Sequence, residues 1–293
     1  EGENTFVTET TYTSNYTKFV LNEGAVLTAS KVFNNEITTV DGYEVKYENG
    51  AYIVVKEVDA VAQIGNQGYA TLQEAVNAAK NDDIITVVAD HKLTWDENTK
   101  VDGQYAAMVC VAGKNVTIDL NGHELTGKTF DGMFAAFAVD NGGSLTLDGT
   151  KGGSVEITGD TASYCLLMGY EAGTKLTVNG GTYHLDKASD SLIYSGGSSD
   201  IVTIIDGTFT LGNVDKGTNG KPWIFNAYGS NINNINVSGG TYNFDINHQY
   251  WAHEVDVAEG KAVVKGKDDL WTVVPAVATA KEMSGNYTRT VGF

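Results

Sequence analysis

The decapeptide "TVNGGTYHLD" (177–186) recurs as "NVSGGTYNFD" (236–245), and a degraded copy, "TIIDGTFTLG" (203–212), lies between them. The copies belong to a longer series in which a short alternating run ends each time in a glycine, at Gly122, Gly149, Gly180, Gly207 and Gly239. Successive glycines are 27, 31, 27 and 32 residues apart. A repeat of roughly 20–50 residues is typical of stacked architectures.

Each repeat contains three strand-like runs. The first is apolar throughout, as in "MFAAFAV" (133–139), the second alternates up to the glycine, as in "LTVNG" (176–180), and the third follows it, as in "TYHLD" (182–186). Enrichment in Val, Ile, Thr and aromatic residues, with Gly, Asn and Asp between the runs, favours strands. Because no amphipathic helical stripe lies between the runs, a parallel sheet with helical crossovers is excluded.

Three strands per repeat resemble the right-handed parallel β-helix, the pectin-lyase-like superfold. That resemblance implies coils stacked at the strand spacing of about 4.8 Å, with equivalent residues in ladders. The expected fold class is all-β: a right-handed parallel β-helix with an N-terminal capping α-helix and flanking β-hairpin and strand segments.

The residues just before the glycines predict one such ladder, made of Asn121, Asp148, Asn179, Asp206 and Ser238. Asn and Asp side chains bond turn backbone and tolerate left-handed geometry beside a glycine. We expect a structural column in which Asp alternates with Asn, so that no two carboxylates are direct neighbours. A row of metal ligands or catalytic acids is the alternative, but chemistry usually needs one coil that differs from the others.

Two further expectations concern buried side chains. The rings of Tyr183, Phe209 and Tyr242 occupy equivalent positions of the third run and are expected to point inward. Cys110 and Cys165 lie in first runs two coils apart. Two strand spacings are about 9.6 Å, whereas a disulfide needs Cα atoms within roughly 7 Å, so both are expected to be buried free thiols.

Upstream of the coils, "YATLQEAVNAAKNDDIITVVAD" (69–90) predicts a helix near 70–80 followed by a strand. Apolar residues recur at helical spacing from Leu72 to Ala79, and Thr71 with Glu74 matches a capping box. Many β-helices begin with such a helix, which closes the open end of the core, and the resemblance implies the same here.

The segments that flank the coils resemble one another. Residues 41–62 match residues 259–280 in pattern, and Asn49-Gly50 predicts a type I′ hairpin in the first copy. This arrangement resembles the repeated β-helical modules of bacterial surface and adhesin-like proteins. We therefore divide the chain into three parts. These are an N-terminal β segment (1–62), interpreted as the remnant of a preceding module, the β-helix with its capping helix (63–270), and a C-terminal strand tail (271–293).

The amino-acid composition of the chain excludes some classes of binding partner. The net charge is −18, with 37 acidic and 19 basic residues, and the single arginine is Arg289. Nucleic-acid binding needs clustered basic residues, so no nucleic-acid partner is expected. No apolar run reaches the roughly 18 residues of a membrane span, so no membrane insertion is expected. The acidic, Thr-, Asn- and Gly-rich composition favours an extracellular or cell-surface location. No signal-peptide pattern precedes Glu1, so we expect a mature secreted chain, with an artificially shortened chain as the alternative.

An enzyme is the alternative reading, because the superfold includes polysaccharide lyases and glycoside hydrolases. The lyases use basic residues and calcium, and the coils here contain no arginine. The adjacent acidic pairs that the hydrolases would need lie outside the coils, so no catalytic residue can be carried over. Carboxylates could still meet in space as a hydrolytic pair, the nearest candidates being Asp119, Glu124, Asp148 and Glu156. The histidines have no metal-binding spacing, so neither a metal nor a cofactor is expected.

The sequence thus favours a non-catalytic extracellular structural or adhesive β-helix, with a polysaccharide-active enzyme as the alternative. Aromatic residues near the C-terminal coils form a candidate glycan or partner surface, with core filling as the competing explanation: Trp223, Tyr228, Tyr250 and Trp251. An alternating strand at 286–293 is the candidate for assembly by strand addition, with folding back on its own chain as the alternative, through Tyr287, Arg289, Val291 and Phe293. The expected partners are other copies of the chain or neighbouring modules, and a glycan or host surface.

Overall fold

The computed structural model describes residues 19–21, 26–28, 37–39, 43–56, 59–171, 173–197, 201–214, 222–228, 234–247, 255–276, 281–283 and 286–288. The chain divides into two compact units, Glu1–Asp59 and Ala60–Phe293, and each is described by itself.

The first unit contains the predicted hairpin. Strands β4 (Tyr43–Glu48) and β5 (Ala51–Lys56) pair antiparallel, and β2 (Val26–Thr28) pairs with the other edge of β5. Asn49 and Gly50 have φ values of 50° and 82°, as a type I′ turn requires, which confirms the prediction. A separate parallel pair joins β1 (Phe19–Leu21) to β3 (Ile37–Thr39).

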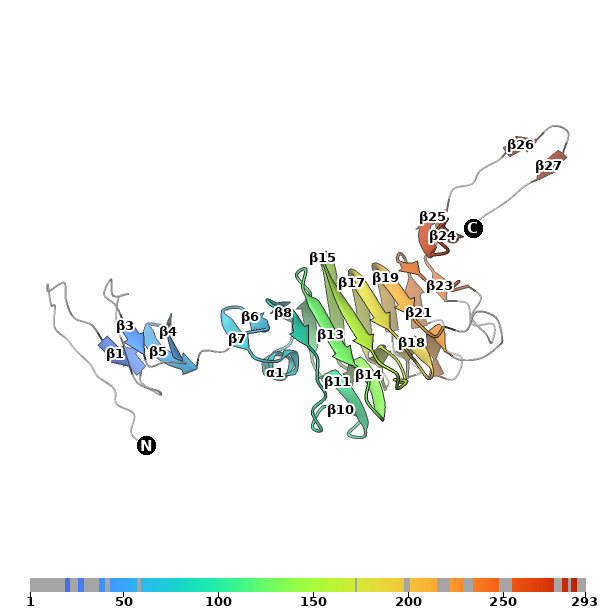
Figure 1. Ribbon diagram of the computed structural model, residues 1–293. Coiled ribbons are helices and arrows are strands. Elements are labelled where there is room, and N and C mark those ends of the chain that lie inside the picture. Colours follow the sequence, from blue (N-terminus) through green and yellow to red (C-terminus); the bar gives the residue numbers. More distant parts are fainter. Residues whose placement is uncertain are drawn as a thin grey trace. The chain divides into compact units, whose positions relative to one another are not determined.

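The second unit is a parallel β-helix of about five turns, in which equivalent strands of successive coils lie side by side (Figure 1). Its first ladder contains β10 (Lys100–Val101), β11 (Tyr105–Ala112), β14 (Met133–Asp140), β16 (Leu167–Gly169), β18 (Ser191–Ser195) and β20 (Trp223–Ala227). Apart from the antiparallel β10, its strands are parallel.

The second and third ladders form one continuous sheet. It contains β8 (Asp83–Val87), β9 (His91–Lys92), β12 (Asn115–Asp119), β13 (Glu124–Lys128), β15 (Ser144–Thr158), β17 (Lys175–Leu185), β19 (Ile201–Leu211), β21 (Ile235–Val237), β22 (Thr241–Tyr242) and β23 (Asp256–Val257). In β15, β17 and β19 the second and third runs join into one strand that contains the repeated glycine. The three runs predicted for each repeat are therefore confirmed as three ladders.

The core lies inside the coils, where the alternating residues of the second and third ladders point. Tyr183, Phe209 and Tyr242 are fully buried, and their rings stack in sequence with centroids 5.2 Å apart and planes at 11°. This confirms that the repeated aromatic position faces inward. The repetition in sequence thus produces a continuous aromatic stack along the inside of the third ladder.

The first ladder is buried on both faces. Its inner residues join the main core, and its outer residues form a second apolar cluster of Val101, Ala107, Cys110, Ala135, Ala138, Cys165, Met168 and Tyr194. Burial on both faces explains why these runs are apolar throughout rather than alternating. Both cysteines are buried free thiols, as predicted. Burial raises the pKa of the Cys110 thiol to about 12, and that of Cys165 also rises, so both remain protonated and unreactive.

Close approach of the coils explains the repeated glycine. A Cβ atom built at Gly149 would lie 2.5 Å from the backbone of Gly181 in the next coil. A side chain at this corner would separate the coils and break the neighbouring ladder bonds. Gly180 and Gly239 approach the backbone of the preceding coil similarly closely, whereas a Cβ at Gly122 would meet nothing nearer than 3.6 Å.

One helix occurs among the described residues, α1 (Leu72–Ala78), after an antiparallel pair of β6 (Ala62–Ile64) and β7 (Gln67–Tyr69). It begins with the predicted capping box, in which Thr71 and Glu74 bond each other's backbone N–H groups. Its apolar face is buried in the main core. Lys114 donates from Nζ to three carbonyls at its C-terminal end, at 2.9–3.1 Å. That the helix closes the open end of the solenoid stays a prediction.

Beyond the coils, β24 (Lys261–Lys265) and β25 (Trp271–Pro275) form an antiparallel hairpin, and β25 pairs antiparallel with β22. The boundary proposed at residue 270 falls inside this hairpin. A second antiparallel pair joins β26 (Lys281–Met283) to β27 (Asn286–Thr288).

Candidate functional site

The polar column before the glycines exists, with one change of membership. Asp148 lies in register with Asn179, and Asn179 with Asp206. The residue next to Asp148 in the preceding coil is Asp119, and not Asn121 as predicted. The prediction aligned the coils on their glycines, but in this coil two extra residues separate the aspartate from the glycine.

Two carboxylates are consequently direct neighbours, contrary to the predicted alternation. Asp119 is only 8% exposed, and its Oδ2 lies 2.6 Å from Nζ of Lys151 in the next coil. Its Oδ1 accepts the N–H of Asn121 at 2.9 Å. The hydrogen bond and charge of Asp119, with a smaller effect of Asp148, raise the pKa of Lys151. The Lys151 ammonium thus compensates the charge of Asp119.

Most side chains at these corners bond turn backbone, as expected. Asn121 has a left-handed φ of 50°, and its Nδ2 donates to the carbonyl of Val87 in the preceding coil at 3.1 Å. Asp148 accepts the N–H two residues ahead at 3.0 Å, and Asp206 accepts that of Gly207 at 2.8 Å. Asp148 and Asp206 thus bond backbone beside the glycines of their own coils, and Asn121 bonds the preceding coil. That the column serves a purely structural role stays a prediction.

The two remaining column positions, Asn179 and Ser238, differ from one another. Ser238 donates from its hydroxyl to the carbonyl of Ile204 in the preceding coil at 3.2 Å. Within the described part of the chain, the Asn179 side chain has no hydrogen bond, so the turn bond expected of it is absent. Asn179 instead lines a shallow polar hollow of about 340 Å³ over the glycine corners, together with Asp206 and several threonines.

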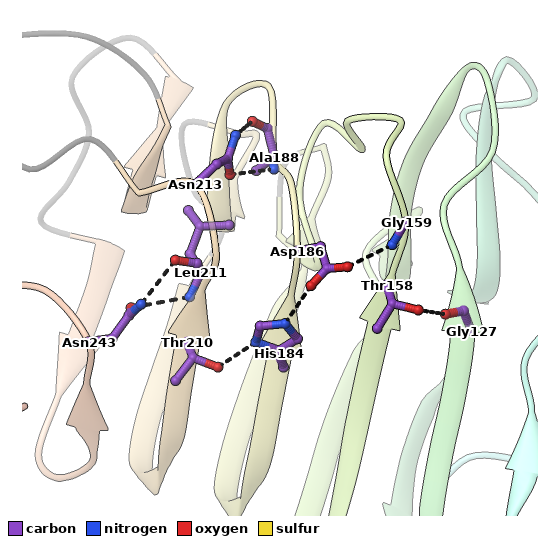
Figure 2. A network of polar contacts seen from close by, with 10 residues as sticks. All are labelled: Gly127, Thr158, Gly159, His184, Asp186, Ala188, Thr210, Leu211, Asn213 and Asn243. Atoms are coloured by element: carbon purple, nitrogen blue, oxygen red, sulfur yellow. Dashed lines mark hydrogen bonds and ion pairs between the residues drawn. The ribbon is translucent and has the colours of Figure 1, made fainter.

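A polar network on the third ladder connects three coils (Figure 2). The imidazole of His184 lies between Thr210 of the next coil, with Nδ1 2.7 Å from Oγ1, and Asp186, with Nε2 2.9 Å from Oδ1. The other oxygen of Asp186 accepts the N–H of Gly159 in the preceding coil at 2.8 Å. This backbone bond, followed by the bond from His184, lowers the pKa of Asp186.

A hydroxyl, an imidazole and a carboxylate are also the groups of a hydrolytic triad. A triad additionally needs donors placed for an oxyanion and a pocket that holds the substrate. The two hollows described in this section are lined by other residues. What the geometry around His184 provides directly is a chain of hydrogen bonds between coils.

Side-chain amides also form hydrogen bonds that join neighbouring segments of the chain. Asn213 bonds both the N–H and the carbonyl of Ala188 at 2.9 Å, and Asn243 bonds both groups of Leu211 at 3.1 and 2.9 Å (Figure 2). Gln73 of α1 makes the same double bond with one residue of β11. Each amide bonds both the N–H and the carbonyl of one residue, as a neighbouring peptide group would.

The predicted aromatic surface is only partly accessible. Trp223 is 7% exposed and belongs to the interior, so it cannot serve as a binding platform, and core filling is the correct reading for it. Tyr228 is 63% exposed and remains a candidate. Tyr250 and Trp251 lie outside the described residues.

The predicted assembly strand is described only at its start. Residue Tyr287 lies in β27, opposite Glu282 of β26, so this part of the strand already has a partner in its own chain. Arg289, Val291 and Phe293 lie outside the described residues.

The four candidate carboxylates do not form one cluster. Asp119 and Asp148 are neighbours in the second ladder, and Lys151 pairs with Asp119. Glu124 and Glu156 lie on the third ladder, where Glu124 stands opposite Ser154 and Glu156 opposite His184. Both glutamates are exposed.

Sequence reasoning missed a hollow of about 360 Å³ beside α1. Trp95, which is 40% exposed, forms part of its wall and stacks on Phe130 with centroids 5.1 Å apart and planes at 19°. The indole Nε1 donates to the carbonyl of Thr99 at 3.2 Å, which fixes the orientation of the ring. A tryptophan in the polar stretch "LTWDEN" (93–98) was the available signal.

Sequence reasoning also missed an aromatic stack on the outside of the first ladder. Tyr105 stacks on Phe134 and Phe134 on Tyr164, at 4.3 and 4.6 Å, and Tyr164 meets Tyr194 edge-on at 5.1 Å. Tyr105, Phe134 and Tyr164 pack against the outer apolar cluster, of which Tyr194 is a member. Burial raises the pKa of Tyr164, so its phenol stays neutral.

Within the described residues, no group of three or more His, Cys, Asp or Glu side chains is arranged to hold a metal ion. No helix in the same part of the chain is long and apolar enough to cross a membrane. Comparisons with protein-family models, with curated proteins and with solved structures found no match.

Proposed function

We propose that the chain is a non-catalytic extracellular structural or adhesive β-helix module. The observation that carries this proposal is that several ionisable side chains of the coils form bonds between coils. Asp119, Lys151, His184 and Asp186 all bond the coil above or below their own. Groups that would perform acid–base or nucleophilic chemistry in an enzyme are thus engaged in joining coils.

A stacked fold gains from such links, because its stability is approximately a sum over coils and their nearest-neighbour interfaces. Each hydrogen bond between coils contributes to one interface. A long ladder stabilised in this way suits a spacer or a display scaffold on a cell surface. The net charge of −18 supports solubility and disfavours binding to anionic polymers.

The proposed partners are a glycan or host surface, and other copies of the chain or neighbouring modules. Exposed Tyr228 supports the first. Support for the second comes from the sequence alternation of Tyr287, Arg289, Val291 and Phe293, which suits strand addition. Removal of residues 284–293 should then convert an oligomer into a monomer in size-exclusion chromatography. A full-length chain that is already a monodisperse monomer at high concentration contradicts assembly.

The alternative is a polysaccharide-active enzyme, and the contact of His184 with both Thr210 and Asp186 is the observation in its favour. The full chain and the His184→Ala variant are incubated with neutral and uronate-containing polysaccharides, and new reducing ends and unsaturated products are measured. The proposal predicts no product from either protein and a lower melting temperature for the variant. Product from the wild type that is lost in the variant, with unchanged melting, would establish the enzyme instead.

A further inference from the structure

The hollow beside α1 presents an aromatic surface of fixed orientation. Phe130 supports the Trp95 ring, and the bond from Nε1 to Thr99 holds the indole in place, yet 40% of the residue is exposed. An aromatic ring that is already ordered loses little side-chain entropy when a ligand packs on it. The C–H faces of a sugar ring are suited to such a surface, and its hydroxyls need polar groups at the edge.

Polar groups of both kinds line the same hollow as the Trp95 ring. Glu74, Asp96 and Asn98 together offer carboxylate acceptors and an amide donor. Gln73 also lines the hollow, but its amide already bonds Asn77 and Cys110. His91 also lines it, and burial lowers the pKa of its imidazole. At neutral pH a neutral imidazole both donates and accepts, as a sugar hydroxyl does. Paired donors and acceptors at the edge of an aromatic ring match a polyhydroxylated ligand.

The charge of the lining residues and the volume of the hollow limit the class of ligand that it can bind. The residues that line the hollow, all within the described part of the chain, include Glu74 and Asp96 but no Lys or Arg. Two carboxylates in a chain of net charge −18 repel uronates, sialic acids and sulfated sugars. A volume of about 360 Å³ lies at the lower end of the roughly 300–1,000 Å³ range of small-molecule sites. That space suits one or two sugar rings.

We propose that this hollow binds a neutral mono- or disaccharide unit, with one sugar ring packed on Trp95 and its hydroxyls bonded by Glu74, Asp96 and Asn98. The inference rests on the proposed adhesive function and deepens it, because it places glycan recognition at the N-terminal end of the coils. The aromatic residues that the sequence suggested lie near the C-terminal coils.

The test is titration of the full chain with a panel of methyl glycosides and disaccharides, neutral and acidic, by calorimetry and tryptophan fluorescence. We expect saturable binding of at least one neutral sugar and none of its uronate counterpart. Trp95→Ala should weaken binding by about tenfold or more, because both the stacking surface and its supported geometry are lost. Trp271→Phe, in the β24–β25 hairpin, is the matched control and should bind as the wild type does.

A second variant distinguishes a loss of the binding site from a loss of folding. Thr94→Phe fills the hollow from an exposed position and should abolish binding while circular dichroism and melting stay unchanged. No binding of any neutral sugar, equal binding by Trp95→Ala, or a preference for the acidic sugars would overturn the inference. Cleavage of a bound sugar would instead contradict the non-catalytic function and leave the binding site standing.

Discussion

Asp119 shows how a single residue constrains this fold. A carboxylate that is 8% exposed loses most of its hydration on folding, and it lies next to Asp148 in the ladder. Such a group is tolerated only when hydrogen bonds and an opposite charge compensate it. Lys151, which comes from the following coil, supplies that charge.

Lys151→Met should therefore lower the free energy of unfolding, because it leaves Asp119 without its cation beside a second acid. Adding Asp119→Asn should recover part of the loss, since the uncompensated charge is then removed. Lys175→Met, which replaces an exposed lysine of the second ladder, is the control and should have little effect. Urea unfolding of the variants measures this. Equal effects of the two lysine substitutions would contradict the role of the ion pair.

The hydrogen bonds of Asp186 predict that the folded protein becomes less stable at low pH. Its pKa is lowered from the usual value of 3.8 by the bonds from Gly159 and His184. A carboxylate with a depressed pKa stabilises the folded state above its unfolded pKa, and that contribution is lost as pH falls through the folded value. Urea midpoints should therefore drop below about pH 4. Asp186→Asn should be less stable at neutral pH and lose less on acidification, and parallel pH profiles of the two proteins would refute the assignment.

At the scale of the element, the sequence pattern was sufficient to predict features that depend on one element alone, such as which side chains of a strand point inward. Period-2 alternation identified the inward rings of the third run, Asn49-Gly50 identified a hairpin, and Thr71 with Glu74 identified the start of a helix. Each of these signals is local. They required only the residues of the element and its immediate neighbours.

The pattern failed where contacts depend on how coils stack. Leu120 and Asn121 displace the glycine of their coil by two positions, so an alignment on glycine misassigned the column. The outer aromatic stack joins residues from successive coils, and the hollow at Trp95 is enclosed by segments distant in sequence. The composition of a single stretch does not reveal which side chains from different segments lie close together in the fold.

The aromatic stack inside the third ladder gives the clearest prediction at this scale. Tyr183→Ala should destabilise the protein by about 3–5 kcal/mol, because it empties a fully buried site and removes the ring packed on Phe209. Thr177→Ala, on the outer face of the same strand, should cost no more than about 0.5 kcal/mol. Chemical denaturation provides both values. Similar losses for the two variants would show that the ring does not contribute as a core residue.

At the scale of the molecule, the second unit is a stack whose polar outer residues are shared between coils. Lys151 reaches back one coil, Asn213 and Asn243 pair with backbone of the preceding coil, and His184 reaches forward to Thr210. These links recur along the solenoid and not at one place. The distribution matches a scaffold, in which every interface needs stabilisation, better than an active site confined to one coil.

The double-mutant cycle of His184→Ala and Thr210→Val tests this account most directly. The two side chains are separated by 26 residues in sequence but bond across adjacent coils at 2.7 Å. Free energies of unfolding of the wild type, both single variants and the double variant give their coupling. The account predicts a favourable coupling of about 0.5–1.5 kcal/mol, the net value of a hydrogen bond. Strictly additive losses would contradict it, because they would show that His184 does not join its coil to the next.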